Sequence, residues 1–243
     1  MSARQGKDFG FSPDLTASVV PVGASRQPVI VVDDALLDPQ SLIEFAAHEA
    51  NFAAAWTARG GYPGVRSDAP RDYVHQLLQH LGGVIEAAYF PSASVSPSHA
   101  NCLLSIVTRR PEQLTSQQRV PHFDTPDPMR IAVLHYLCDA SFGGTAFYRH
   151  RKTGLEAVQP NQEAEFCRIR DEELKAAPPP VGFISDDTAD YQQTAAIEAR
   201  FNRLIIYRSQ HLHSGLIPMD MNFSENPREG RLTATVFIGY QLA

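Results

Sequence analysis

Apolar positions follow two different periods along the chain. In residues 38–56 and 70–90, apolar side chains recur every three or four positions, which is typical of amphipathic helices that bury one face. Asp38 and Pro39 suit the N-cap and the first position of the first helix. We therefore expect two helices in the first half of the chain. Their inward stripes are Leu42, Phe45, Phe52 and Trp56 in the first and Leu77, Leu78, Leu81 and Ile85 in the second.

From about residue 100 the pattern changes to short β-branched or aromatic runs between turn residues, which predict strands. An earlier run, PVIVVDD (28–34), has the same character. Helices followed by a series of strands predict an α+β chain whose second half is a sandwich or a barrel. A charged, partly helical excursion at 150–190 and a loop at 57–69 are the expected covers of a site. The later strand-like runs are 102–108, 130–137, 145–150, 195–201, 203–209 and 231–240.

The composition narrows the classes of function. The chain has 243 residues, 43% of them hydrophobic, so it can bury a sizeable core, and most of it is expected to form one domain after a polar N-terminal arm at 1–27. A formal net charge of −6 with scattered basic residues predicts no nucleic-acid partner and leaves a small-molecule or peptide partner. Three widely spaced cysteines, no signal-peptide pattern and no apolar run near ~18 residues predict a cytoplasmic protein without a membrane span. A homodimer fits the sequence, but no feature indicates one.

A candidate metal site begins at His122 and Asp124. Residues i and i+2 of a strand point to the same side, so this pair could bind one metal ion together. His211 and His213 follow the strand-like run 203–209, and one of them would complete a set of two histidines and one carboxylate. That facial triad is typical of non-haem Fe(II) sites, which keep open positions for a cosubstrate and dioxygen. Alone, a His-x-Asp motif is also common in polar loops.

Basic residues near the predicted strand ends are candidate anion ligands. Arg231 opens the last strand-like run, and its guanidinium suits a carboxylate, although an ordinary surface arginine at a strand start has the same pattern. Arg149, His150 and Arg151 form a second cluster at the end of the run 145–150. This cluster fits either an acidic substrate group at the mouth of a site or a solvated strand end.

These motifs occur together, in order, over residues 118–238, and there the chain resembles the Fe(II)/2-oxoglutarate-dependent oxygenases, particularly their prolyl 4-hydroxylase-like branch. The segment Tyr136-Leu137-Cys138, then Gly143-Gly144 and Phe147, is similar to a strand, turn and strand of that branch, and 28–47 is similar to its opening strand and helix. The resemblance implies a double-stranded β-helix, a jelly-roll or cupin-like barrel, with N-terminal supporting helices. It divides a single oxygenase domain, 28–243, into packing elements at 28–95 and a barrel at 96–243 with the 150–190 insertion.

The resemblance also implies the chemistry of the site. His122, Asp124 and His213 would bind Fe(II), with His211 as the alternative distal ligand. Arg231, Tyr136 and Thr233 would hold the cosubstrate 2-oxoglutarate. The reaction would use dioxygen to hydroxylate an unactivated C–H bond of a small molecule, an amino acid or a peptidyl residue, with release of succinate and carbon dioxide. Because Asp124 is retained, hydroxylation or another oxidation is favoured over halogenation.

Three departures from the family pattern leave parts of the site assignment open. The interval from His213 to Arg231 is longer than usual, Cys138 stands where asparagine is frequent, and no clear counterpart precedes His122 for a tyrosine that often flanks the cosubstrate. A Zn or Mn enzyme on the same barrel would use the same three metal ligands without needing the carboxylate clamp. A non-catalytic β-sandwich binding module would need neither metal nor clamp.

Overall fold

The computed structural model describes residues 9–58 and 60–243, which form two antiparallel sheets with three α-helices and three short 3-10 helices. The eight-stranded sheet has the order β1-β2-β9-β6-β11-β5-β4-β3, and the three-stranded sheet has the order β10-β7-β8. The strands are β1 Ala17–Val22, β2 Gln27–Val32, β3 Ala53–Thr57, β4 Gly60–Asp68, β5 Val95–Val107, β6 Arg130–Tyr136, β7 Thr145–His150, β8 Tyr191–Ile197, β9 Arg203–Arg208, β10 His213–Gly215 and β11 Leu232–Leu242. The helices are α1 Pro39–His48, α2 Arg71–Tyr89, α3 Glu163–Ala176, η1 Pro111–Gln113, η2 Ser116–Arg119 and η3 Ala140–Phe142.

Strand β11 shows how the sequence gives the large sheet two different faces. Its apolar residues alternate with two threonines and an aromatic residue, and a strand sends alternate side chains to opposite faces. Leu232, Ala234, Val236 and Ile238 are fully buried in the core that also contains Leu77, Leu81 and Ile85 of α2. Thr233, Thr235 and Phe237 line a cavity. One face therefore supports the fold, and the other is available for a site.

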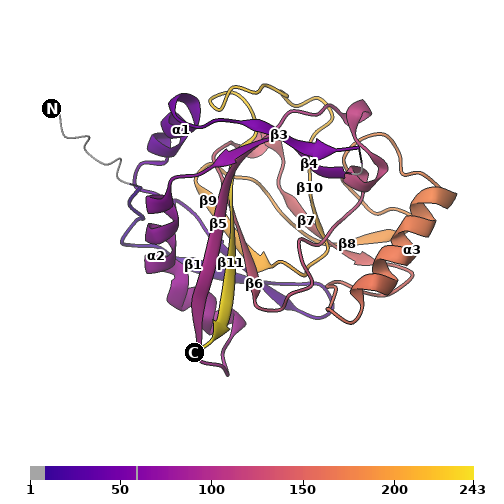
Figure 1. Cartoon of the computed structure of the whole chain (residues 1–243), viewed down its shortest axis with the longest axis horizontal. Helices are drawn as coiled ribbons and strands as arrows, with labels where there is room; N and C mark the ends of the chain where they lie inside the picture. Colours follow the sequence, from indigo (N-terminus) through magenta and orange to yellow (C-terminus); the bar gives the residue numbers. More distant parts are fainter. Residues whose placement is uncertain (1–8, 59) are drawn as a thin grey trace.

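Helices α1 and α2 lie on the same side of the molecule, and α3 lies on the opposite side near the small sheet (Figure 1). Full burial of one apolar side chain stabilises a fold by about 1.5–3 kcal/mol, so the stripe on α2 contributes strongly. Leu77, Leu81 and Ile85 are buried as expected, while Leu78 is only partly buried. A mostly antiparallel structure with few helices agrees with the jelly-roll-like fold class that the sequence predicts.

Several predicted boundaries are wrong. Helix α1 ends at His48, so Phe52 follows it and Trp56 belongs to β3 instead of extending the helical stripe. The Asp38 side chain makes no capping hydrogen bond, and its carbonyl accepts the Ser41 hydroxyl instead. Strand β8 covers 191–197 where 195–201 was expected. Residues 57–69 are mostly strand β4 and not a loop.

The segment predicted as an N-terminal arm contains a strand within its described residues. Residues 1–8 of it lie outside the described residues, but Ala17–Val22 forms β1, which pairs antiparallel with β2 along its whole length. Glu156 fixes the β1–β2 turn, because its carboxylate accepts the backbone N–H groups of Ala24 and Ser25 and the Ser25 hydroxyl at 2.7–3.1 Å. The insertion at 150–190 does contain a helix, α3, as expected.

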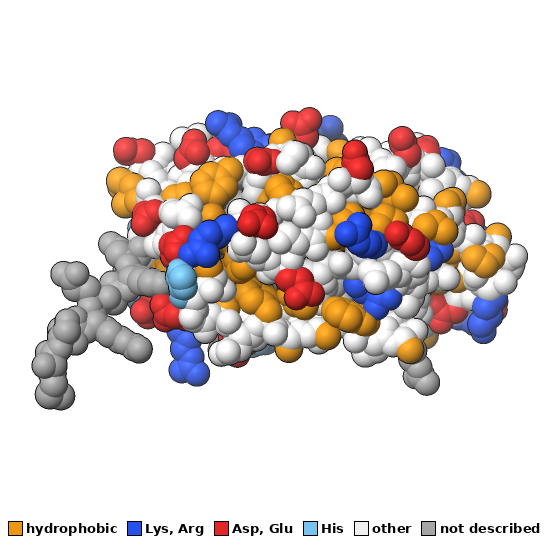
Figure 2. All heavy atoms as spheres, turned by 90° about the horizontal axis from the view of Figure 1, so that it is seen from above, with side chains coloured by type: hydrophobic (Ala, Val, Ile, Leu, Met, Phe, Trp, Pro, Cys, Tyr) orange, Lys and Arg blue, Asp and Glu red, His pale blue; other side chains and the backbone are white. Residues whose placement is uncertain are grey.

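Acidic and basic side chains are interspersed on the face seen in Figure 2, with apolar patches between them. Within the part of the chain that the structure describes, none of the helices has the length and apolar character needed to cross a bilayer.

Candidate metal centre

Two chain segments 91 positions apart are held side by side by their backbones. His122 and His213 form an isolated antiparallel bridge, in which the His122 N–H donates to the His213 carbonyl at 2.9 Å and the His213 N–H donates to the His122 carbonyl at 2.8 Å. Their ring centroids lie 4.4 Å apart. The strand β10 that carries His213 also pairs with β7, so the bridge joins the 122 segment to the small sheet.

Asp124 completes a cluster of three metal-ligand types. Its backbone N–H donates to the Ser209 carbonyl at 2.9 Å, which fixes the segment after His122. Its carboxylate oxygens lie 3.9 Å from His122 Nε2 and 3.8 Å from His213 Nε2. Two ligand atoms each about 2.1 Å from one ion can be separated by up to about 4.2 Å, so these distances fit a shared ion. Among the described residues, this is the one group of three or more His, Cys, Asp or Glu side chains close enough to hold a metal.

The hydrogen bonding of His213 leaves the correct nitrogen free for a metal. Nδ1 of His213 lies 2.9 Å from the backbone carbonyl of His211, so Nδ1 carries the proton and donates. Nε2 then presents its lone pair toward Asp124 and His122. A histidine that binds metal through one nitrogen usually donates its other N–H in this way.

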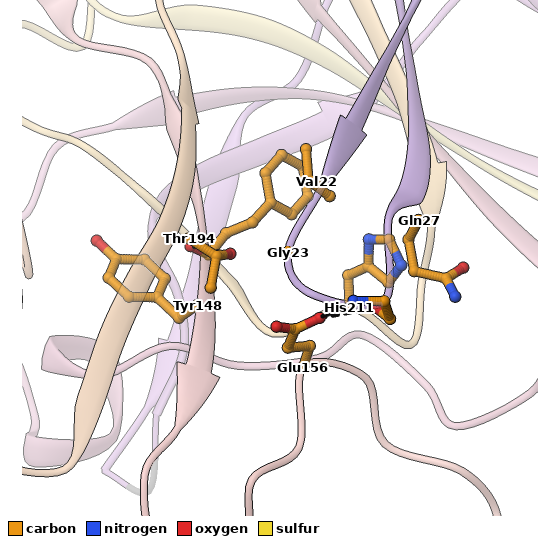
Figure 3. Close-up of a pocket in the computed structure, with 9 residues that line it drawn as sticks. Val22, Gly23, Gln27, Tyr148, Glu156, Thr194 and His211 are labelled. Carbon is orange, nitrogen blue, oxygen red and sulfur yellow. Dashed lines mark hydrogen bonds between the residues drawn. The ribbon is translucent and has the colours of Figure 1, made fainter.

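His211 lies outside the cluster of His122, Asp124 and His213. It is 3% exposed, and it lines a small hollow with Glu156 and the β1–β2 turn that includes Gly23 (Figure 3). Its ring packs edge-on against Phe147, and neither ring nitrogen has a hydrogen-bond partner. Of the two histidines that the sequence left open, the structure therefore brings His213 and not His211 to the cluster.

The cluster opens onto a cavity of about 380 Å³ between the two sheets. This volume is within the usual range for small-molecule sites. The inward side chains of β11, with β4 and the small sheet, form much of its wall, and α3 contributes Arg170. The predicted cover at 150–190 also contributes Phe183, and the predicted cover at 57–69 contributes Tyr62 and Arg66. The basic cluster at 149–151 lies outside the wall: Arg151 pairs with Asp187 at 2.7 Å, and His150 Nε2 lies 2.8 Å from Glu173.

Arg231 lies on the cavity wall and is only 4% exposed. Its Nε donates to the Phe142 carbonyl at 3.0 Å, and Nη2 donates to the Gly144 carbonyl at 3.3 Å. Both residues of the turn that accepts these bonds must be glycine, because a side chain on Gly143 would collide with the Leu216 carbonyl and one on Gly144 with the Ile197 carbonyl. The backbone thus approaches closely and fixes a buried guanidinium at one side of the cavity.

The hydroxyl groups near Arg231 differ from the expected set. Thr233 lines the cavity, as does Thr145 of β7. Tyr136 is fully buried and is not part of the cavity wall; its hydroxyl lies 2.7 Å from the Thr145 hydroxyl, and its ring centroid lies 5.8 Å from the Arg231 guanidinium carbon. Tyr136 therefore contacts the cavity through Thr145.

Three further wall residues were missed from the sequence. Tyr207 packs against the His213 ring with centroids 4.9 Å apart. Tyr62 and Arg66 come from β4, where alternation puts them on the same face, but the Gly- and Pro-rich sequence around them resembles a loop. The Tyr62 hydroxyl is buried without a hydrogen-bond partner, which makes it available to a bound molecule.

The cavity environment shifts the pKa values of two residues of the cluster. Burial raises the pKa of Asp124, although His213 and Arg66 act in the opposite direction. Enclosure lowers the pKa of His122, and neighbouring His213 and Arg66 lower it further. A neutral His122 keeps the lone pair that a metal needs, because metal ligands must be deprotonated. The donor set and its charge state thus fit a divalent ion.

The fold and the cluster together define a β-sheet protein with a candidate metal centre next to a small-molecule cavity. The chain belongs to the family described as "Family of unknown function (DUF6445)", which matches residues 13–238. A search of curated proteins gives no match.

Solved structures show which fold the chain shares. HygX from Streptomyces hygroscopicus, crystallised with nickel and 2-oxoglutarate, is similar with a TM-score of 0.51 and 11% identity over 87% of this chain and 82% of that chain. AviO1 from Streptomyces viridochromogenes has a TM-score of 0.44 and 12% identity over 86% and 89% of the two chains. An N-substituted L-amino acid dioxygenase from Burkholderia ambifaria has a TM-score of 0.40 and 8% identity over 94% of each. At these identities, the likeness to HygX concerns the fold alone.

Proposed function

We propose that this protein is an Fe(II)- and 2-oxoglutarate-dependent dioxygenase on a double-stranded β-helix. The observation that carries the proposal is the joint placement of His122, Asp124 and His213 on one cavity with Arg231. A metal site alone would suit many enzymes, whereas a buried arginine on the same wall adds a place for a carboxylate. The fold neighbour HygX, crystallised with nickel and 2-oxoglutarate, supports the same pairing of ligands.

The proposal assigns roles to the residues in and around the cavity wall. His122, Asp124 and His213 would hold the iron through ligand atoms that cluster beside the cavity. Arg231, with the hydroxyls of Thr145 and Thr233, binds the far carboxylate of 2-oxoglutarate, and Tyr136 positions Thr145 through their hydrogen bond. Tyr207 fixes the His213 ring by packing. Bound together with dioxygen, iron and 2-oxoglutarate supply the oxidation of a C–H bond, with release of succinate and carbon dioxide.

The finer points of the proposal follow the sequence resemblance. The reaction is hydroxylation of an unactivated C–H bond in a small molecule, an amino acid or a peptidyl residue, in the manner of the prolyl 4-hydroxylase-like branch. The compartment is the cytoplasm, and no nucleic acid takes part. A Zn or Mn hydrolase is less well supported, because it would have no use for Arg231.

An anaerobic titration tests the proposal. Fe(II) and 2-oxoglutarate are added to the purified protein, and visible absorbance is recorded. A weak charge-transfer band should appear only when both are present, and it should be lost in His122→Ala while His75→Ala, an exposed histidine on α2, keeps it. No band in folded wild-type protein that demonstrably holds the metal would refute the proposal.

A further inference from the structure

The cavity has more positive charge than the proposed cosubstrate needs. Three arginines line it, Arg66, Arg170 and Arg231, and Asp124 is the single acidic side chain among the described residues of the wall. Arg170 already has a carboxylate, because its Nε and Nη2 donate to Asp171 at 3.0 and 2.9 Å. Arg231 is assigned to 2-oxoglutarate in the proposed function. Arg66 is left without an acidic partner within 4.0 Å in the described part of the chain.

Arg66 is held in a fixed orientation although no carboxylate lies within 4.0 Å of it among the described residues, and the charge of Asp124 acts on it only from a longer distance. Its Nε donates to the Ser105 hydroxyl at 3.1 Å, and its guanidinium carbon lies 4.2 Å from the centroid of the Tyr62 ring. Ser105 is the cross-strand partner of Arg66 on β5, so the sheet register sets this contact. The bond to Nε leaves the two terminal nitrogens, Nη1 and Nη2, free to donate to two oxygen atoms of one anion.

The desolvation of the Arg66 guanidinium is unfavourable unless an anion binds to it. Partial burial lowers the pKa of Arg66, which means that the charged form is poorly solvated there. A guanidinium out of bulk water without a carboxylate is unfavourable unless a ligand compensates it. A divalent ion, ionised Asp124, Arg231 and dianionic 2-oxoglutarate sum to zero charge, so Arg66 leaves one positive charge uncompensated.

We propose that Arg66 binds an anionic group of the substrate, a carboxylate or a phosphate, beside the metal centre. This inference rests on the proposed function. The rest of the substrate is apolar or aromatic where it meets the wall, because Phe123, Phe183, Val107 and Ile217 line the same cavity. The basic cluster Arg149–Arg151 does not have this role, since none of its residues lines the cavity and Arg151 is paired with Asp187.

Matched probe pairs test the inference by binding, without turnover. Protein loaded with Mn(II) and 2-oxoglutarate is titrated calorimetrically with 3-phenylpropanoate against 3-phenylpropanamide, and with phenyl phosphate against phenol. The two pairs distinguish a carboxylate from a phosphate as the source of the charge. Wild-type protein should bind at least one anion about tenfold or more tightly than its neutral partner, as one charge-assisted hydrogen bond allows.

Variants assign this preference to Arg66. Arg66→Gln should bind both members of the pair within about twofold, and Arg66→Lys should keep part of the preference because it keeps the charge but not the fork. Arg168→Gln is the matched control, because Arg168 is an exposed arginine on α3 that pairs with Glu172 and does not line the cavity. Equal binding within both pairs, no binding of either anion, or a preference that survives in Arg66→Gln would overturn the inference.

Titration of wild type, Arg66→Gln and Arg231→Gln with Mn(II) and 2-oxoglutarate separates this inference from the proposed function. If Arg66→Gln loses 2-oxoglutarate binding as Arg231→Gln does, Arg66 serves the cosubstrate and the inference fails while the proposed function stands. If wild-type protein binds no Mn(II) with 2-oxoglutarate, the proposed function fails. The probe titrations on the metal-free protein then decide about the anion site alone, by the same comparison of wild type with Arg66→Gln.

Discussion

Replacing Arg231 with glutamine measures how much Arg231 contributes to the binding of the 2-oxoglutarate carboxylate. Arg231 commits Nε and one Nη2 hydrogen to backbone carbonyls, which leaves the Nη1 donors and the second Nη2 hydrogen for a ligand. One hydrogen bond to a charged partner contributes about 1.5–3 kcal/mol. Arg231→Gln should therefore weaken 2-oxoglutarate binding about 10- to 150-fold, because the remaining amide can donate but has no charge.

The effect can be followed by two independent assays on protein loaded with Mn(II). Calorimetry gives the Kd directly. Urea unfolding gives the linked stability: at a ligand concentration 100 times the wild-type Kd, 2-oxoglutarate should stabilise wild type by about 2.7 kcal/mol, and a variant with a 100-fold weaker Kd by about 0.4 kcal/mol. Arg168→Gln should behave as wild type. An unchanged Kd in folded Arg231→Gln protein would refute the assignment of the cosubstrate site.

Three further predictions concern other parts of the molecule. His135 is fully buried between Tyr73 and Asn202, and burial lowers its pKa to about 4. The stability that neutral His135 contributes is complete above pH 6.5 and is lost as the pH falls toward 4. In urea unfolding, His135→Gln should therefore lose about 3 kcal/mol less stability than wild type between these pH values. His211→Leu should leave Mn(II) affinity unchanged in calorimetry, whereas His213→Leu should abolish it. Gly83→Ala, on an exposed turn of α2 with no atom within 4 Å of the new Cβ, should raise the free energy of unfolding by about 0.5–1 kcal/mol.

Each of these predictions has a contrary result. The burial argument for His135 fails if wild type and His135→Gln lose equal stability between pH 7 and pH 4. Loss of metal binding in folded His211→Leu protein would restore His211 as a ligand. For the glycine, the matched comparison is Gly143→Ala, where φ is +73° and the new Cβ would lie 1.6 Å from the Leu216 carbonyl oxygen. That substitution should destabilise by at least about 1–3 kcal/mol, and a gain in stability there would contradict the packing.

Runs of β-branched and aromatic residues between turn residues made most strands of the two sheets predictable. Thr233 and Thr235 alternate with Leu232 and Ala234, so the sequence alone assigns two faces to β11, and the structure places them as alternation requires. The helix α2 was equally clear from its apolar stripe. Both are local patterns, in which the burial of one face dictates the residue types.

Strand β4 was not predictable in the same way. Gly60, Gly61, Pro63 and Gly64 are ordinary turn signals, yet Gly64 is needed in the strand because a Cβ there would lie 1.9 Å from the Ile106 carbonyl oxygen. The glycine reflects close contact with β5, which a single sequence does not reveal. The error concealed two residues of the cavity wall, Tyr62 and Arg66.

The choice between His211 and His213 also needed three dimensions. Both histidines follow the same strand and share its parity, so local pattern treats them alike. The backbone bridge from His122 to His213 makes the difference, because it depends on contact between segments 91 positions apart. The order of the motifs predicted the site, and the family resemblance favoured His213 with His211 as the alternative; the structure brings His213 to the cluster.

Diffraction from crystals grown with Mn(II) and 2-oxoglutarate tests the central claim most directly, since anomalous scattering locates the ion without assumption. The account predicts one ion bound by Nε2 of His122, Nε2 of His213 and the Asp124 carboxylate, with the far carboxylate of 2-oxoglutarate on Arg231. An ion at any other position in fully loaded crystals, or a 2-oxoglutarate carboxylate that bypasses Arg231, would contradict it.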